Sequence, residues 1–393
     1  MLTLTFLLSS PNVRFSTRRL LSVNIARRGL AAANQEDGSV TKRRRSTVMA
    51  DVARAAGVSH QTVSRVINEA DHVRPETRDR VLLAMRELDY RPNSLARALV
   101  TGRSRTLGVV SFDTTLYGPA STLFGIERAA HAEGYFVSIA SVTSLDRASV
   151  LGAVERLRAQ GVDGILIITP HDAAAQAVLH VPPDMPVVAV EAGPTESVPV
   201  VAVDQVAGAA AATRHLLELG HRTVWHVAGP SDWLEARQRV EGWTATLTEA
   251  GADIPPLLAG DWSARSGYEL GKRLVTVRDV TAVFAANDQM ALGILRALDE
   301  ARRDVPQDIS VVGFDDIPEA QFFSPPLTTV RQDFNEMGRQ SLMLLLGEID
   351  APRRTSSRVV VEPELRVRES TAPPRGSLTA AALRRRGRRT AGR

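Results

Sequence analysis

The sequence of 393 residues contains no cysteine. This absence excludes disulfide bonds, thiolate metal ligands and cysteine nucleophiles, and it suits a reducing compartment. No uninterrupted apolar run approaches the roughly 20 residues that span a bilayer, so no membrane segment is expected. The stretch LGVVSFDTTLYG, at the first expected strand, lacks the spacing G-x-G-x-x-G, which argues against a dinucleotide-dependent dehydrogenase. The length leaves room for two or three domains with a sizeable core.

Positive charge is concentrated near the two ends of the chain. Residues 41–105 hold 14 Lys/Arg and 7 Asp/Glu, and residues 352–393 hold 12 and 3. Because the whole chain carries only +4, with +3 of it on residues 1–40, the body over residues 106–351 is strongly acidic, at −15. A basic head on an acidic body indicates that the head meets a polyanion such as nucleic acid. Solvated basic tails are the alternative that charge alone leaves open.

Residues 1–46 are expected to be a disordered or mis-assigned N-terminal extension. The segment MLTLTFLLSS is apolar but lacks the basic start of a signal peptide. A start at Val40, read from a GTG codon, would give a chain that continues TKRRRSTVMADVARAAGVS. Mass spectrometry of the natural N-terminal peptide distinguishes this start from Met1.

The basic head has the pattern of three short helices. STVMADVARAAG is amphipathic, with Val48, Val52 and Ala55/Ala56 expected to face inward, and a glycine ends it. GVSHQTVSRVIN follows, with Ser59 as its N-cap, and PETRDRVLLAMRELDY forms the third helix, with an apolar stripe that includes Leu82. A tight glycine turn between the first two helices is typical of a helix-turn-helix unit, whose second helix enters the major groove.

The outward face of this second helix carries groups that can read base pairs. Gln61 can bond bidentately to adenine, and Arg65 can bond to the O6/N7 edge of guanine. The hydroxyl and amide side chains of Ser59, Thr62, Ser64 and Asn68 suit phosphates or base edges. An ordinary solvated helix face is the alternative that spacing alone leaves open.

The body alternates strand-like and helical segments in two series, which predicts two lobes with parallel sheets and a cleft between them. The second series is expected to start at VVAVD, residues 200–204. Ligands of such sheets bind beyond the carboxyl ends of the strands. Polar and aromatic residues stand at these ends: Glu191, Arg237, Trp262, Asn287, Asp288, Asp315 and Asp316. Carboxylates, an amide and a guanidinium can bind sugar hydroxyl groups, and an indole can cover a sugar ring. Asp288 and Asp316 as helix N-caps, and Trp262 as a core residue, are the alternatives.

Long motifs identify a family. MADVARAAGVSHQTVSRVINEADHVRPETRDRVLLAMRELDYRPNSLARAL resembles, without a gap, the DNA-binding headpiece of the lactose-repressor (LacI/GalR) family. LAGDWSARSGY, AANDQMALG, DISVVGFDD and PPLTTVRQDF extend the resemblance over residues 47–368. It implies a small all-α helix-turn-helix headpiece and an α/β core with the two-lobed periplasmic-binding-protein-like fold. The implied function is a cytoplasmic, nucleoid-associated bacterial repressor of sugar-catabolism genes, released from a palindromic operator by a sugar inducer. The expected inducer is a galactoside or related glycoside.

The resemblance also implies roles for single residues. His60, Gln61 and Arg65 would read bases, and Tyr90 would contact the DNA backbone. In a hinge helix, Asn93 would be the cap, Ala96 would face the minor groove, and Leu99 would wedge between base pairs. The residues that match inducer-contacting positions are Leu116, Pro119, Glu191, Arg237, Trp262, Asn287, Asp315 and Phe334. Phe112 and Thr169 depart from the family pattern at the lip of the first lobe.

The implied domains are a helix-turn-helix domain (47–92), a hinge helix and linker (93–105), and a sugar-binding and dimerisation domain (106–368), with chain crossovers near 203, 332 and 355. Residues 369–393 are expected to be a disordered basic tail. Because the tail has no sustained leucine heptad, the expected assembly is a homodimer. The expected partners are double-stranded operator DNA and a small sugar, with no cofactor, metal or membrane.

Three other functions remain open from the sequence. A glycosidase could use Glu191 and Asp315 as an acid/base pair, although a DNA-reading head argues against it. A secreted sugar-binding protein would explain the body but not the head. Within the regulators, a purine-type corepressor could replace the sugar, although GDWSARSG favours the sugar.

Overall fold

The computed structural model describes residues 47–67, 73–91, 98, 101–112, 114–142, 144, 146–168, 171, 176–193, 197–351 and 355–375. The chain divides into two compact units, residues 1–91 and 92–393. The expected extension over residues 1–46 lies outside the described residues.

The first unit contains the three expected helices, α1 (Met49–Ala56), α2 (His60–Ile67) and α3 (Pro75–Glu87). Gly57 takes a left-handed conformation (φ 63°), which lets the chain turn tightly after α1. Ser59 caps α2, because its Oγ accepts a hydrogen bond from the backbone N–H of Thr62 at 3.1 Å. These findings confirm the predicted helix-turn-helix arrangement.

The core of this unit is small. Val52, Val63 and Val81 are completely buried, one from each helix. Three inward-facing predictions were wrong: Val48 is 44% exposed, Leu82 is 38% exposed, and Ala55 is exposed as well. Three short helices have too little inner surface to bury every apolar residue that lies near their inward stripes.

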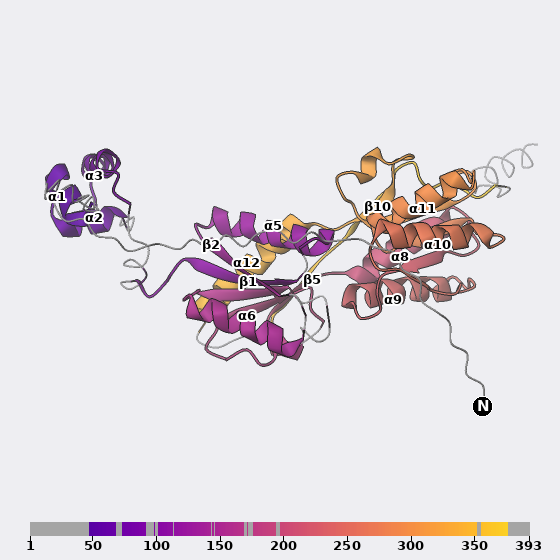
Figure 1. Cartoon of the computed structure of the whole chain (residues 1–393), viewed down its shortest axis with the longest axis horizontal. Coiled ribbons are helices and arrows are strands. Elements are labelled where there is room, and N and C mark those ends of the chain that lie inside the picture. Colours follow the sequence, from indigo (N-terminus) through magenta and orange to yellow (C-terminus); the bar gives the residue numbers. More distant parts are fainter. Residues whose placement is uncertain are drawn as a thin grey trace, which may run out of the picture. The chain divides into compact units, whose positions relative to one another are not determined.

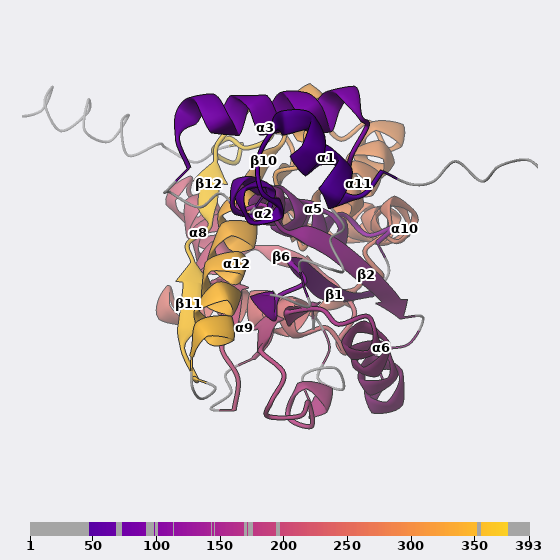
Figure 2. The same cartoon turned by 90° about the vertical axis from the view of Figure 1, so that its left-hand side faces the viewer.

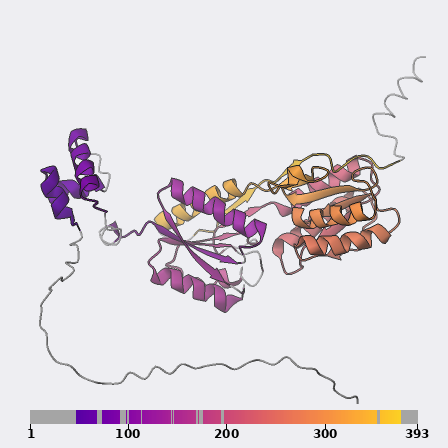
Figure 3. The ribbon, with the colours of Figure 1, turned by 45° about the horizontal axis from the view of Figure 1, so that its top comes forward.

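The second unit contains two six-stranded sheets, which stand side by side in Figure 3. The first sheet, with its helices, is the N-terminal lobe. Its strand order is β11-β5-β4-β3-β1-β2, and the paired strands are parallel. Its strands are β1 (Thr106–Phe112), β2 (Phe136–Val142), β3 (Gly164–Ile168), β4 (Val187–Val190), β5 (Val200–Val203) and β11 (Arg358–Val361). Helices α5 (Tyr117–Ala132) and α12 (Phe334–Asp350) cover one face and α6 (Arg147–Ala159) covers the other (Figure 1).

The second sheet, with its helices, is the C-terminal lobe, in the order β12-β10-β9-β8-β6-β7. Its strands are β6 (Trp225–Ala228), β7 (Leu258–Ala259), β8 (Ala282–Ala285), β9 (Ser310–Asp315), β10 (Thr328–Arg331) and the antiparallel edge strand β12 (Glu364–Arg366). Helices α8 (Gln205–Glu218) and α9 (Leu234–Glu249) pack on one face, and α10 (Ala264–Thr276) and α11 (Asp288–Glu300) on the other. A short 3₁₀ helix, η1 (Ala320–Phe322), follows β9.

The chain passes between the lobes after β5, after β10 and between β11 and β12. The first two crossovers agree with the predictions near 203 and 332. The third was wrong: residues 358–361 still pair with β5 in the first sheet, so the crossover falls at 362–363 and not near 355. Figure 2 shows β11 beside α12, on the N-terminal lobe. The expectation that residues 200–204 start the second series was also wrong, because β5 pairs with β4 in the first sheet.

The predicted end of the core domain at 368 is too early. Ser370 is completely buried, its backbone O accepts from the N–H of Val311 (2.8 Å), and its Oγ accepts from the N–H of Thr328 (2.8 Å). Residues 369–375 therefore belong to the C-terminal lobe, and the rest of the expected tail, 376–393, lies outside the described residues. Within the part of the chain that the structure describes, no helix is both long and apolar enough to cross a membrane.

Candidate functional site

The outward face of α2 presents the predicted base readers to solvent. His60, Gln61 and Arg65 are exposed, while Val63 and Val66 of the same helix are buried in the core of the first unit. Thr62 and Ser64 are half-buried at the edges of the exposed face. The helix therefore holds an imidazole, an amide and a guanidinium on one accessible side, which is the geometry that major-groove reading requires.

The other predicted DNA contacts are less completely described. The hydroxyl groups of Ser59 and Thr62 lie 2.9 Å apart and hydrogen-bond each other. Tyr90 is half-buried and packs against the core of the first unit. Asn68, Asn93, Ala96 and Leu99 lie outside the described residues, as does most of the expected hinge helix. Ala98 and Thr101 are helical.

A cavity lies between the two lobes of the second unit, at the carboxyl ends of their strands. It contains about 880 Å³ of space free of protein atoms, which includes space open to solvent. The N-terminal lobe contributes Thr115, Leu116, Tyr117, Gly118, Pro119, Thr122, Ile168, Glu191 and Phe334. The C-terminal lobe contributes Trp233, Glu235, Arg239, Trp262, Ser263, Ala264, Asn287, Gln289 and Asp315, and Gln332 stands at the second crossover.

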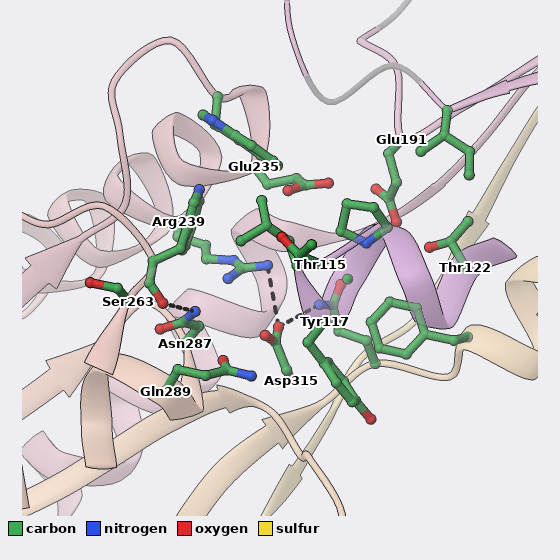
Figure 4. Close-up of a pocket in the computed structure, with 18 of the residues that line it drawn as sticks. Thr115, Tyr117, Thr122, Glu191, Glu235, Arg239, Ser263, Asn287, Gln289 and Asp315 are labelled. Carbon is green, nitrogen blue, oxygen red and sulfur yellow. Dashed lines mark hydrogen bonds and ion pairs between the residues drawn. The ribbon is translucent and has the colours of Figure 1, made fainter. Parts of the chain in front are cut away.

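Seven of the eight predicted ligand residues line this cavity: Leu116, Pro119, Glu191, Trp262, Asn287, Asp315 and Phe334. The eighth, Arg237, does not. Its Nη1 donates to the backbone O of Ser231 at 3.1 Å on the exposed side of α9. The cavity arginine is Arg239, two residues further along the helix, where the side chain points to the interior (Figure 4). In a helix, two residues rotate the side chain by about 200°, to the opposite face.

Arg239 belongs to a closed network of buried polar groups. Its Nε donates to Oε1 of Gln205 (2.9 Å), and Nε2 of Gln205 donates to Oε1 of Gln332 (2.8 Å). Nε2 of Gln332 donates to Oδ1 of Asp315 (2.7 Å), which lies 3.7 Å from Nη2 of Arg239. Arg239 also donates to the backbone O of Ala286. Every member is buried, so the network fixes the guanidinium and the carboxylate at the floor of the cavity.

The strand-end carboxylates have different roles. Burial raises the pKa of Asp315 to about 6, against the opposing effects of Arg239 and Gln332. Asp288 is completely buried outside the cavity lining, and accepts from the N–H of Ile317 (2.9 Å) and from the hydroxyl of Thr329 (2.6 Å). Burial and the charge of Asp315 raise the pKa of Asp288 well above its ordinary value. Asp288 is therefore a structural residue, but the N-cap of α11 is its neighbour Asn287.

Asp316 is also structural. Its Oδ1 lies 2.6 Å from Nη2 of Arg368 in a half-buried ion pair. The pair holds the segment after β12 against the end of β9. Neither predicted alternative for Asp316, a ligand contact or a helix cap, is what this geometry provides.

Asn287 and Trp262 are hydrogen-bonded to each other on the wall of the cavity that the C-terminal lobe forms. Oδ1 of Asn287 accepts from the N–H of Met290 (2.9 Å), and its Nδ2 donates to the backbone O of Trp262 (3.0 Å). Trp262 is 8% exposed, so it is a core residue and a cavity residue at once. Its indole Nε1 has no hydrogen-bond partner among the described residues. A ligand hydroxyl is one group that could accept from it.

Aromatic rings surround these polar groups. Trp233 meets Trp262 edge to face with ring centres 5.6 Å apart, and Tyr117 meets Phe334 in the same way at 5.7 Å. Phe112, a departure from the family pattern, does not line the cavity but packs edge-on against His171 at 6.0 Å. Thr169, the other departure, lies outside the described residues.

Glu235 is a cavity carboxylate that the sequence analysis missed. It lies on the first turn of α9, four residues before Arg239, and is half-buried. Burial and the charge of Asp315 raise its pKa to about 7, against the opposing effect of Arg239. Burial and the charge of Glu235 also raise the pKa of Glu191 well above its ordinary value. Glu191 is 5% exposed and stands at the end of β4 in a left-handed conformation (φ 60°), which turns the chain at the cavity edge.

The described residues contain no group of three or more His, Asp or Glu side chains arranged to hold a metal ion. The polar groups of the cavity are instead spread over its walls, among aromatic rings. This arrangement suits a ligand with many hydroxyl groups.

Comparisons with known proteins agree with both units. Residues 48–93 match the family model described as bacterial regulatory proteins, lacI family, and residues 213–371 match that of the periplasmic binding protein-like domain. The lactose operon repressor of Klebsiella pneumoniae is 33% identical over 84% of this chain and 94% of its own length. The transcriptional repressor PurR of Haemophilus influenzae is 35% identical over 81% of this chain and 97% of its own length.

Solved structures match as well. The lac repressor dimer bound to operator and the anti-inducer ONPF has a TM-score of 0.74 at 35% identity, covering 84% of this chain and all of that one. The complex of the regulator CelR with cellobiose has a TM-score of 0.61 at 34% identity, covering 82% and 99%. These relatives are regulators and not enzymes, which removes the glycosidase alternative. With a helix-turn-helix head and a two-lobed core that match along nearly their whole length, this chain belongs to the LacI family of DNA-binding transcriptional regulators.

Proposed function

We propose that this protein is a homodimeric repressor of sugar-catabolism genes that a sugar inducer releases from a palindromic operator. The observation that carries the proposal is the cavity: hydrogen-bonding side chains and aromatic rings converge between two lobes in a chain that also has a DNA-reading helix. Such a protein works in the bacterial cytoplasm, on the nucleoid.

On the DNA side, His60, Gln61 and Arg65 read base edges, because they share the exposed face of α2. Ser59, Thr62, Ser64, Asn68 and Tyr90 contact the DNA backbone or neighbouring base edges, and Asn93, Ala96 and Leu99 act in the hinge helix. Arg65 contacts guanine and Gln61 contacts adenine by their bidentate geometry. Homodimerisation places two such helices on half-sites about one helical turn apart.

On the sugar side, Arg239 and Asp315 hold adjacent hydroxyl groups from the floor of the cavity, and Arg239 takes the place predicted for Arg237. Glu191, Asn287 and Trp262 surround the ring, with Leu116, Pro119 and Phe334 as the apolar wall. The structures of two relatives contain the anti-inducer ONPF and cellobiose, and the second of these, a disaccharide, supports a glycoside ligand. A galactoside is our first choice.

Exposed apolar side chains at the edge of the first sheet support the homodimer. β2 is an edge strand of the first sheet, and its Phe136 and Ile139 are 70% and 51% exposed. Phe124 of α5 is 60% exposed. Large apolar side chains exposed at one edge of a sheet favour an interaction surface there.

The test is operator release by the full chain. A DNA palindrome selected from a random library is titrated with protein, and fluorescence anisotropy follows release during titration with a panel of galactosides, glucosides and monosaccharides. Purine bases in the same panel test the corepressor alternative. We expect specific binding with a Kd of roughly 10⁻⁸ M or tighter, and release by at least one sugar. Tighter DNA binding with a purine, or no response to any sugar, would contradict the proposal.

A further inference from the structure

Two carboxylates of the cavity face the same space from different lobes. Glu191 enters from the end of β4 in the N-terminal lobe, and Glu235 enters from α9 in the C-terminal lobe. Figure 4 shows the two side chains approaching the cavity from opposite sides. Glu235 forms no hydrogen bond or ion pair of its own among the described residues, so its carboxylate remains available to a ligand.

The described lining of the cavity has fewer cations than carboxylates. Its described lining contains Glu191, Glu235 and Asp315 but only one Lys or Arg, which is Arg239. The guanidinium of Arg239 is already directed to Gln205, to the backbone O of Ala286 and to Asp315. Burial of a carboxylate raises its pKa, and so does a neighbouring negative charge, which is Glu235 for Glu191 and Asp315 for Glu235. Both pKa values are raised here.

The walls favour a cation as well. Trp233 and Trp262 lie on the lobe that carries Glu235, and Tyr117 lies on the lobe that carries Glu191. The face of an aromatic ring attracts a positive charge, and more strongly where water is excluded. Trp262 is more than nine-tenths buried, and its Nε1 has no hydrogen-bond partner among the described residues. This N–H is a second group that can bind a ligand in the cavity. Sugar hydroxyl groups can accept from this N–H, whereas a simple cation cannot.

We propose that the cavity binds an amino sugar, which the proposed function makes the inducer, with its ammonium group between Glu191 and Glu235 and its hydroxyl groups on Arg239 and Asp315. This inference rests on the proposed function, since it names the chemical class of the sugar. A neutral sugar would leave the two carboxylates without a counter-charge. An ammonium group donates three hydrogen bonds and cancels the repulsion between them.

The test uses pairs of sugars that differ only in one group. Isothermal titration of the full chain compares galactosamine with galactose, glucosamine with glucose, and deacetylated chitobiose with cellobiose, and the N-acetylated form of each amino sugar removes the charge but keeps the nitrogen. We expect at least one amino sugar to bind about tenfold or more tightly than both its neutral counterparts, a difference of about 1.4 kcal/mol. Equal or tighter binding of the neutral sugars, or no binding by any amino sugar, would overturn the inference.

Two variants test whether the preference for amino sugars depends on the carboxylate of Glu235. Glu235→Gln keeps the size and hydrogen bonding of the side chain but removes its charge, and should reduce the preference for the amino sugar to less than about twofold. Glu241→Gln, on the exposed side of α9, is the matched control and should leave the preference unchanged. A preference that survives in Glu235→Gln would also overturn the inference.

Operator release in the same samples separates this inference from the proposed function. An amino sugar that binds with the expected preference but does not release operator supports the inference and contradicts the proposed function. A neutral sugar that binds as tightly as its amino counterpart and releases operator supports the proposed function and contradicts the inference.

Discussion

Arg237 and Arg239 illustrate how much two positions along a helix decide. Both are arginines near a strand end, and the sequence analysis chose the wrong one. Arg239 lies on the buried stripe of α9 with Ala236 and Trp243, whereas Arg237 is half-exposed. The sequence does contain a pattern that distinguishes the two arginines, because Arg239 shares the helical spacing of the apolar residues Ala236 and Trp243. An arginine at such a position is buried and needs hydrogen-bonding partners that a surface arginine does not need.

We therefore expect opposite results from the two arginines. Arg239→Ala leaves the carboxylate of Asp315 buried without its cation and should lower the free energy of unfolding by about 3–5 kcal/mol. Arg239→Lys keeps the charge but loses the planar guanidinium that reaches Gln205 and the Ala286 backbone O together. It should therefore abolish the release of operator by sugar, with a smaller loss of stability than Arg239→Ala. Urea unfolding and operator release measure these effects.

Arg237→Ala is the control. It should change the free energy of unfolding by no more than about 0.5 kcal/mol and leave the release of operator by sugar intact. A loss of release in Arg237→Ala, with normal release in Arg239→Lys, would restore the original prediction.

The raised pKa of Glu235, about 7, has a direct consequence for stability. The unfolded chain loses this proton near pH 4.3, so between about pH 5 and 7 the folded protein holds a proton that the unfolded chain does not. The free energy of unfolding should therefore fall as the pH rises through this range. Glu191, Asp315 and Arg239 are the charged groups that face Glu235.

Glu235→Gln should reduce this slope in ligand-free protein, as measured by urea unfolding at several pH values. The slope should not vanish, because the pKa of Asp315 is raised to about 6 and acts in the same direction. Glu241→Gln should keep the original slope. A slope that is unchanged in Glu235→Gln would show that its carboxyl group does not titrate in this range.

At the scale of elements, the sequence predicted the strands and the helix-turn-helix well, because their apolar periodicity is local. It predicted their partners less well. VVAVD at 200–204 is a buried strand in either lobe, and only its pairing with β4 and β11 assigns it to the first sheet. The position of the third crossover and the attachment of residues 369–375 to the C-terminal lobe were mispredicted for the same reason. Hydrogen bonds to strands that are distant in the sequence leave no local pattern in it.

Helix α2 gives the prediction that belongs to this scale. Arg65→Ala removes an exposed guanidinium from the reading face without disturbing Val63 or Val66, so the headpiece should fold normally. We expect operator binding to weaken by about 1–3 kcal/mol, with relaxed preference at one symmetric base pair, as measured by anisotropy with single-base operator variants.

Arg54 of α1 is the comparison, since its side chain is 79% exposed and pairs with Asp51 off the reading face. Arg54→Ala should keep the base preference of the wild type. If Arg65→Ala weakened binding to all sequences equally, Arg65 would be a phosphate contact.

At the scale of the molecule, the cavity network connects the ligand site to the chain crossovers. Gln205 follows the first crossover and Gln332 stands at the second, and both are hydrogen-bonded in the ring with Arg239 and Asp315. A ligand that contacts Arg239 and Asp315 therefore acts on groups fixed to two of the three connections between the lobes. This is a physical route by which occupancy can favour one arrangement of the lobes over another.

A sugar can release the operator only if it binds the DNA-free state more tightly than the DNA-bound state. Linkage then requires the operator to weaken sugar binding by the same factor, typically about 5–150-fold. Isothermal titration of the inducing sugar into free protein, and into protein saturated with operator, measures this factor directly. Protein mixed with a scrambled palindrome is the control and should bind sugar as the free protein does. Equal sugar affinity with and without operator would mean that the sugar site does not control DNA binding, whatever occupies the cavity.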